Sequence, residues 1–190
     1  MKKLIWLVDM SLDGFMSGPS GELDWAGANM DDELWEDVID LLRTVDAALF
    51  GRLTYQNFEN YWPTAASNPA SPKNELHFSR WIEETPKTVA SKTLNRLEWK
   101  NSILLNANVA EGVSKMKGQP GKNVVMFGSC SLASHLLKAG LIDELRIRVH
   151  PVVLGVGRPL FKDGAERHKL KLVKSRTFDS GVVGLRYNVA

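Results

Sequence analysis

Apolar residues occur along this chain in short runs, and helix-periodic segments lie between those runs. A short apolar run bounded by turn residues is typical of a β-strand, whereas apolar residues three and four positions apart are typical of a helix face. The runs predict strands at 3–9, 46–50, 87–91, 102–106 and 124–127. The periodic segments predict helices from about Asp31, at 53–61, 73–84 and 109–117, and from Leu132 onward. Strands joined through helices are parallel, so the pattern predicts a largely parallel sheet.

The C-terminal third has a different pattern. Residues 144–150 alternate strictly between apolar and polar side chains, as a strand does. The runs 169–178 and 182–189 are also strand-like, and residues 179–181 between them are typical of a hairpin turn. We therefore expect an α/β fold in one domain over residues 1–190, with a mixed, mainly parallel sheet that ends in an antiparallel hairpin.

Two segments rich in glycine or proline predict loops. Residues 11–21, after the first strand, contain several glycines. Residues 63–72 contain three prolines among small polar side chains. Because proline interrupts helices and strands, we expect residues 63–72 to form a mobile excursion between two helices.

Composition narrows the class of protein. Of the 190 residues 44% are apolar and 24% are charged, which is ordinary for a globular protein. The formal net charge of +2, with basic residues scattered among acidic ones, gives no argument for nucleic acid binding. No stretch approaches the roughly 18 apolar residues of a membrane span. The single cysteine excludes an internal disulfide and the four histidines lack paired metal spacing, so we expect a cytoplasmic protein with no metal site.

The segment 124–132 reads as a strand, a glycine turn and a helix, an arrangement that suits a phosphate. The first backbone N–H groups of a helix have no internal partner and add to the positive end of the helix dipole. Gly128 lets the backbone approach a ligand closely, and Ser129 and Ser131 add hydroxyl groups. Cys130 is interpreted as a small packed residue, because no base is evident beside it.

A second strand, at 47–50, ends in a similar way. Gly51 follows it, and then come the guanidinium of Arg52 and the hydroxyl of Thr54 at the start of the next helix. Ligands of open α/β sheets bind at strand ends, and arginine is well shaped to hold a phosphate through two parallel hydrogen bonds. Two strand ends thus offer donors to an anion.

Five short motifs in order resemble the dihydrofolate reductase superfamily, and most closely the reductase domain of bacterial riboflavin biosynthesis. They are residues 11–14, 51–54, 89–92, 127–129 and the segment from Gly140 to Phe161. The resemblance covers nearly the whole chain. It implies a three-layer α/β fold with helices on both faces of the sheet, a reductase activity and a homodimer.

The resemblance also implies the residues that bind the cofactor. Gly51, Arg52 and Thr54 match the motif that holds the 2′-phosphate and pyrophosphate, and Ser91 with Lys92 matches a strand end that borders the same 2′-phosphate. This pair of cations implies NADPH, whose 2′-phosphate NADH lacks. The pyrophosphate turn is matched by Phe127, Gly128, Ser129, Cys130, Ser131 and Leu132, although Ser129 and Cys130 stand where the family usually has more glycine.

The loop from Asp13 to Gly18, with Met16 and Ser17, matches the segment that covers the nicotinamide, and a simple surface turn is the alternative. Trp35 and Trp25 are candidates for the wall of the substrate cleft. Two further cations, Arg158 and Lys162, are candidates for a substrate phosphate, with solvated surface charge as the alternative.

One departure from the superfamily pattern concerns the catalytic acid. Dihydrofolate reductases carry a carboxylate on the first helix, and the matching position here is about Trp35, which exchanges no proton. Asp31 is the nearby candidate, with helix capping as its alternative role. The riboflavin-pathway reductase does not use that acid, so the departure favours it. The zinc deaminase signature that is often fused to that reductase is absent from this sequence.

Three functions therefore stay open. The first is an NADPH-dependent reductase of a small heterocyclic or ribosylamine substrate. The second is a pterin reductase that uses a displaced acid such as Asp31. The third is a nucleotide-binding dimeric module without turnover, in which the polar face of the strand 144–150, formed by Arg146, Arg148 and His150, lies either at an interface or in water.

Overall fold

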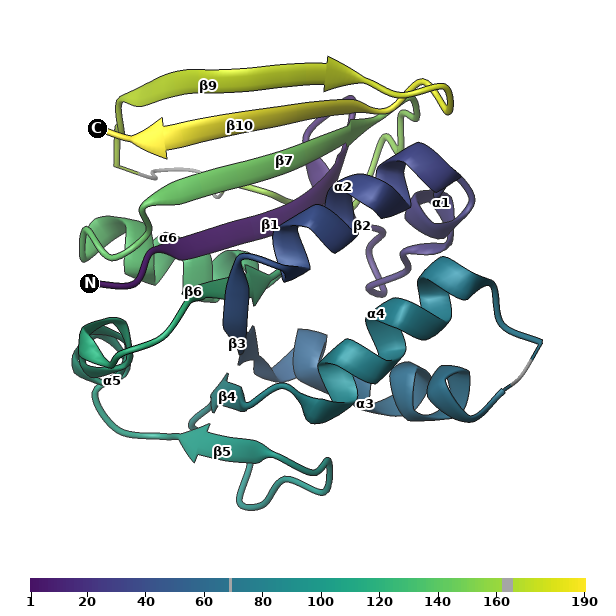
Figure 1. The fold of residues 1–190 in the computed structure, drawn as a ribbon. Helices are drawn as coiled ribbons and strands as arrows, with labels where there is room; N and C mark the ends of the chain where they lie inside the picture. The colour runs from purple at the N-terminus through teal and green to yellow at the C-terminus, as the bar shows by residue number, and fades with distance from the viewer. Residues whose placement is uncertain (69, 162–165) are drawn as a thin grey trace.

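The chain is built around one eight-stranded sheet (Figure 1). The computed structural model describes residues 1–68, 70–161 and 166–190. Along the sheet the strands follow the order β5-β4-β3-β6-β1-β7-β10-β9. Their bounds are β1 Leu4–Ser11, β3 Val45–Gly51, β4 Lys87–Ala90, β5 Ser102–Leu105, β6 Asn123–Phe127, β7 Glu144–His150, β9 Leu170–Thr177 and β10 Val183–Val189. From β5 to β7 all neighbours are parallel, whereas β10 runs antiparallel to both β7 and β9, so the expected mixed sheet and C-terminal hairpin are confirmed.

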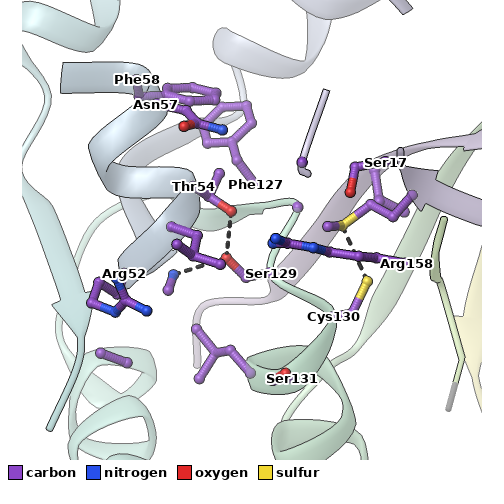
Figure 2. A pocket seen from close by; sticks show the side chains of 18 of the residues that line it. Ser17, Arg52, Thr54, Asn57, Phe58, Phe127, Ser129, Cys130, Ser131 and Arg158 are labelled. Atoms are coloured by element: carbon purple, nitrogen blue, oxygen red, sulfur yellow. Dashed lines mark hydrogen bonds between the residues drawn. The ribbon is translucent and has the colours of Figure 1, made fainter. Parts of the chain in front are cut away.

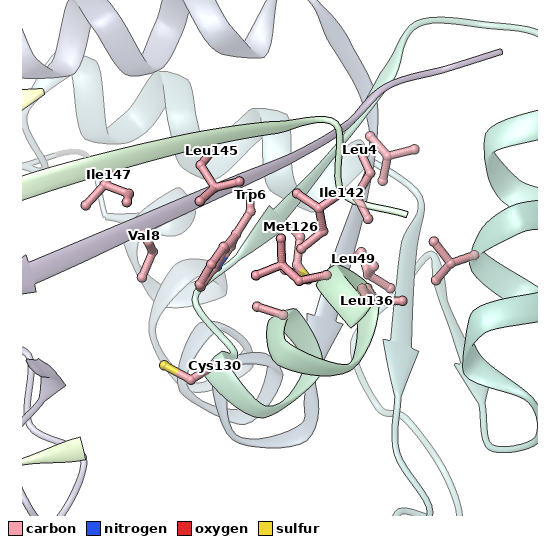
Figure 3. Packing of buried hydrophobic residues seen from close by; sticks show 14 of the residues in the cluster. Leu4, Trp6, Val8, Leu49, Met126, Cys130, Leu136, Ile142, Leu145 and Ile147 are labelled. Carbon is pink, nitrogen blue, oxygen red and sulfur yellow. The ribbon is translucent and has the colours of Figure 1, made fainter. Parts of the chain in front are cut away.

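Helices cover both faces of the sheet, in the predicted three layers. Their bounds are α1 Asp24–Gly27, α2 Asp32–Leu42, α3 Arg52–Ser67, α4 Lys73–Glu84, α5 Val109–Gly118 and α6 Cys130–Lys138. The alternation along β1 explains the two cores. Leu4, Trp6 and Val8 pack with α5 and α6 on one face, whereas Ile5 and Leu7 pack with α2, α3 and α4 on the other (Figure 3 shows the first face). No helix among the described residues is long and apolar enough to cross a membrane.

The expected excursion at residues 63–72 is wrong in its first half, because α3 continues through Pro63 to Ser67. The apolar face of α3 explains why the helix tolerates the proline. Trp62 contacts Phe78 of α4 with ring centroids 4.3 Å apart and Trp35 of α2 at 6.5 Å. Pro63 lacks one backbone hydrogen bond, but these aromatic contacts fix the residue before it in the helix. Pro69, in the same segment, lies outside the described residues.

A second, two-stranded sheet was not predicted. It pairs β2 (Phe15–Ser17) with β8 (Arg158–Pro159) in antiparallel orientation. The pairing depends on Gly157, because a Cβ atom there would lie 2.3 Å from the Ser17 carbonyl oxygen. Asp13 ties the same two segments together by accepting hydrogen bonds from the backbone N–H groups of Leu154 and Gly155, at 3.1 and 2.7 Å.

The alternating strand β7 lies inside the sheet, between β1 and β10. Its polar face is occupied by contacts within the chain. Arg148 and His150 both bond to Asp9 of β1, and Arg146 bonds to the buried carboxylate of Glu144. His150 is completely buried. The alternation predicted the strand correctly, and within the chain these three side chains bond to Asp9 and Glu144. The dimer interface suggested for this face stays a prediction.

Candidate functional site

A cleft of about 1000 Å³ lies along the carboxyl ends of the central strands. Five neighbouring strands contribute to its wall in their order across the sheet. Lys92 follows β4, Arg52 follows β3, Gly128 follows β6, Asp9 lies near the end of β1 and Arg148 lies on β7. Neighbouring strands are about 4.8 Å apart, so this wall spans roughly 20 Å.

The turn between β6 and α6 presents the start of α6 to the cleft. Gly128 and Ser129 both adopt left-handed backbone conformations, with φ of +51° and +61°. The first hydrogen bond within α6 runs from the Ala133 N–H to the Ser129 carbonyl oxygen, at 2.9 Å. The backbone N–H groups of the helix residues before Ala133 therefore have no partner within the helix. The indole Nε1 of Trp6 donates to the Gly128 carbonyl oxygen at 2.7 Å and fixes the turn from below.

Ser129 joins this turn to the second one, between β3 and α3. Its Oγ accepts a hydrogen bond from the Gly51 N–H at 2.9 Å and shares another with Thr54 Oγ1 at 2.9 Å (Figure 2). The starts of α3 and α6 are therefore held together at one place in the cleft. The Ser129 hydroxyl therefore joins the two turns, and the role in ligand binding that the sequence suggested for it stays a prediction.

Replacing Gly51 with alanine is expected to loosen this junction. The new Cβ would lie 2.9 Å from Ser129 Oγ, closer than such contacts allow, and Ser129 has no long side chain with which to give way. We expect the free energy of unfolding to fall by about 1–3 kcal/mol, measured by chemical denaturation. Gly118→Ala is the control, because a Cβ at the end of α5 meets no atom within 4 Å. Equal stability of both variants would show that the junction tolerates the methyl group.

Arg52 and Lys92 carry the fixed positive charge at one end of the cleft. Both line the cleft and are exposed. Within the described residues neither forms an ion pair with a carboxylate, and Arg52 donates only to the amide oxygen of Gln56, at 3.2 Å. Ser91 also lines the cleft, but its Oγ accepts hydrogen bonds from the N–H groups of Thr93 and Leu94 and so shapes the loop that carries Lys92.

The other predicted cofactor-binding residues meet in the same cleft. Figure 2 shows Arg52 and Thr54 on one side of Ser129, and Cys130, Ser17 and Arg158 on the other. Met16 lines the cleft as well, and Cys130 Sγ lies 3.1 Å from Met16 Sδ. Every predicted cofactor-binding residue lines this cleft: Gly51, Arg52, Thr54, Ser91, Lys92, Phe127, Gly128, Ser129, Cys130, Ser131 and Leu132.

The predicted nicotinamide loop is only partly at the cleft. Met16 and Ser17 line it, whereas Asp13 and Gly18 do not. Pairing of β2 with β8 holds the loop in place, and Arg158 of β8 also lines the cleft. Lys162, the second candidate for a substrate phosphate, lies outside the described residues.

The candidate acid Asp31 and the two candidate tryptophans of the cleft wall lie away from the cleft. Asp31 is the N-cap of α2, where its carboxylate accepts from the Leu34 N–H at 2.7 Å and from the Ser180 N–H at 2.8 Å. Burial tends to raise the pKa of Asp31, but these N–H groups outweigh burial and lower it. Trp35 packs in the aromatic core against Trp62 and Phe78, and neither Trp35 nor Trp25 lines the cleft.

The sequence reading missed a charged cluster at the other end of the cleft. Asp9 accepts from Arg148 Nη2 at 2.6 Å and bonds to His150 Nε2 at 2.7 Å. Burial favours the neutral form of Asp9, but the Arg148 charge and the His150 hydrogen bond prevail and lower its pKa from 3.8 to about 2. The sequence contained one signal for this cluster. Asp9 ends an apolar strand, and Arg148 and His150 share the polar face of another strand.

The comparisons with known proteins agree with this fold. The family model of the RibD C-terminal domain matches residues 2–184. The uncharacterized protein YyaP of Bacillus subtilis (strain 168) is 36% identical over 187 residues, which cover 98% of this chain and 95% of that protein.

Two solved structures share the fold at low sequence identity. A putative riboflavin biosynthesis protein from Shewanella sp. PV-4 superposes with a TM-score of 0.75 at 21% identity and 99% coverage of both chains. The diaminohydroxyphosphoribosylaminopyrimidine deaminase/5-amino-6-(5-phosphoribosylamino)uracil reductase of Thermotoga maritima superposes with a TM-score of 0.67 at 14% identity. This chain is covered completely in that match, but only 57% of the Thermotoga protein is. Stand-alone and larger proteins thus share this architecture.

Proposed function

We propose that this chain, which belongs to the RibD C-terminal domain family, is an NADPH-dependent reductase of the riboflavin-pathway type. The proposed substrate is a small heterocyclic or ribosylamine compound. The observation that carries the proposal is the meeting of two helix starts and two cations, Arg52 and Lys92, in one cleft along the strand ends. This donor set suits a ligand with several phosphate groups.

Each part of the cleft has a role in this proposal. The starts of α3 and α6 would hold the pyrophosphate, and Arg52 with Lys92 would hold the 2′-phosphate. Glycine at 51 and 128 lets Ser129 and Thr54 lie close to the backbone, so the two turns can pack side by side. Met16 and Ser17 of β2 would cover the reacting ring and exclude water. Bound NADPH supplies the hydride, whereas the protein supplies orientation and a dry cleft.

The placement of Asp31 favours the proposed function over the pterin reductase alternative. Both carboxylate oxygens of Asp31 bond to backbone N–H groups, and Asp31 does not line the cleft. The non-catalytic module is distinguished by NADPH oxidation in the presence of candidate substrates, since only an enzyme would show turnover.

A homodimer is part of the proposal, with β9 at its interface instead of β7. The edge strand β9 leaves Leu170, Leu172 and Val173 between 38% and 51% exposed. Exposed apolar side chains on an unpaired sheet edge suit pairing with a second copy. Light scattering coupled to size exclusion measures the mass, and a monomer at micromolar concentration would contradict this part of the proposal.

Replacing Arg52 with alanine is expected to remove the preference for NADPH over NADH. A charge-assisted hydrogen bond to the 2′-phosphate is worth about 1.5–3 kcal/mol, so the affinity for NADPH should fall about tenfold or more while that for NADH stays nearly constant. Calorimetric titration with both nucleotides measures the change. Arg43→Ala is the matched control, because Arg43 is exposed at the end of α2, outside the cleft. If the wild-type protein binds neither nucleotide at millimolar concentration, the proposal fails.

A further inference from the structure

The cleft has a second polar end, which phosphate binding does not use. Asp9 of β1 and Arg148 of β7 lie opposite each other in the register of the two parallel strands, and both side chains line the cleft. Lys92 follows β4 and Arg52 follows β3, so β6 lies between the strands that lead to these two cations and the strands of the Asp9–Arg148 pair. A ligand that extends along the cleft from the phosphate end reaches this pair with its opposite end.

The surroundings of the pair hold it in one arrangement. His150, which is completely buried, fixes one carboxylate oxygen of Asp9, and Arg148 Nη2 fixes the other. Trp25 of α1 packs edge-on against the His150 ring with centroids 5.2 Å apart. No described residue bonds to His150 Nδ1, so Nε2, which bonds to Asp9, is the ring nitrogen that holds the carboxylate.

The pair retains capacity for hydrogen bonds to a ligand. Asp9 is ionised, because Arg148 and His150 outweigh burial and hold its pKa at about 2, so Asp9 only accepts hydrogen bonds. Each of its oxygens uses one of its two acceptor positions. Arg148 only donates, and its Nη1 has just a weak 3.9 Å contact with Met30 Sδ. Arg148 Nε is buried without a hydrogen-bond partner among the described residues.

An acceptor and a donor side by side, with opposite charges that cancel, complement a particular chemical group. An isolated phosphate or ammonium would meet one attractive and one repulsive charge. A neutral group with an N–H next to a C=O would bond to both, as an amide or a ring lactam does. We propose that Asp9 and Arg148 recognise the amide or lactam edge of the group that occupies this end of the cleft, with His150 as a positioning residue.

This inference rests on the proposed function, because it assigns the end of the cleft that the phosphates leave open. Two sources supply such an edge: the ring of the substrate and the carboxamide of the nicotinamide. The edge is the same in both cases. The two sources differ in which dissociation constant changes when Asp9 or Arg148 is replaced, that of uracil or that of NADPH.

The test uses a pair of small probes and the intact protein. Uracil carries ring N–H groups next to carbonyls, whereas 1,3-dimethyluracil keeps the carbonyls and has no N–H. With wild-type protein saturated with NADPH, and also without it, we expect uracil to bind about tenfold tighter than the dimethyl compound in a ligand-observed NMR titration in at least one of the two states. Equal affinities in both states would overturn the inference. Because the probes need no turnover, a protein that binds NADPH but ignores the N–H groups would sink the inference and leave the reductase proposal standing.

Two variants then assign the preference to the pair. Asp9→Asn removes the charge and Arg148→Lys keeps it but loses the planar guanidinium, and each is expected to reduce the preference for uracil to about twofold or less. A preference that survives in either folded variant would contradict the assignment. Asp46→Asn is the matched control, because Asp46 pairs with Lys2 and lies outside the cleft. If the variants fail to fold, the wild-type comparison of the two probes still decides the inference.

The NADPH affinity of the same variants separates the two sources. If the substrate supplies the edge, the dissociation constant for NADPH stays within about twofold of wild type, and only uracil binding weakens. If the nicotinamide carboxamide supplies it, NADPH binding weakens about tenfold, and uracil discriminates only in the protein without NADPH. Both results support recognition of an amide edge, whereas unchanged affinity for both NADPH and uracil would overturn it.

Discussion

Replacing Trp6 with alanine is expected to lower the free energy of unfolding by about 3–5 kcal/mol, a large share of the stability of a domain this size. Trp6 is completely buried in the centre of the sheet, between Met126 of β6 and Leu145 of β7 (Figure 3). Alanine would leave a cavity in close-packed surroundings. It would also remove the indole donor from the Gly128 carbonyl oxygen. Urea denaturation followed by circular dichroism measures the loss.

Trp6→Phe separates packing from hydrogen bonding. It keeps most of the apolar volume but loses Nε1, so we expect a smaller loss of about 1–3 kcal/mol and a weaker hold on the turn at Gly128. The affinity for NADPH should fall with it, because that turn starts α6. Ile103→Ala is the surface control, since Ile103 is 66% exposed, and should change stability by about 0.5 kcal/mol. A Trp6→Ala protein as stable as this control would show that the sheet repacks around the cavity.

Replacing Arg148 with methionine is expected to destabilise the protein by about 3–5 kcal/mol at pH 7, because it leaves the Asp9 carboxylate without its cation. The pKa of Asp9 in the folded protein, about 2, lies below its ordinary value of 3.8. The unfolded chain therefore binds the proton first as the pH falls, so the ion pair stabilises fully above about pH 4 and its contribution is lost as the pH falls through about 2. The difference between wild type and variant should shrink over that interval.

Denaturation curves of both proteins at pH 7 and at several values between about 4 and 2 measure this difference. Arg43→Met is the matched control, because the Arg43–Asp40 pair is about 70% exposed on both sides and surface pairs contribute little. A difference that stays constant down to about pH 2 would mean that Arg148 stabilises by packing and not by its charge.

Most of the fold could be predicted because the spacing of apolar residues in each helix or strand shows which of its sides is buried. The apolar runs and helix-periodic segments predicted all eight strands of the main sheet and the five longer helices. The pattern failed at Pro63, where contacts between Trp62 and the neighbouring helices override a local helix breaker. It also missed β2, β8 and α1, which are too short to show a period.

The end of the cleft that contains Gly51 and Gly128 could be predicted from the sequence, because glycine turns after strands are local signals. The Asp9–Arg148–His150 cluster could not. The alternation of β7 shows that three polar side chains share a face, but it carries no information about which strand lies beside them. The register of β1 against β7 joins Asp9 to residues far along the chain, and only the assembled sheet brings them together.

The central place of β1 has a consequence for how the chain folds. Leu4 pairs with Val124 and Ile5 with Glu144, so the first strand finds neither neighbour until most of the chain has been synthesised. Contacts between distant residues make folding slow, and an unpaired apolar strand is prone to aggregation. We expect β1 to stay outside the native sheet during translation until β6 and β7 have been synthesised. Refolding from denaturant should then take milliseconds to seconds, with β1 acquiring protection from hydrogen exchange together with β7.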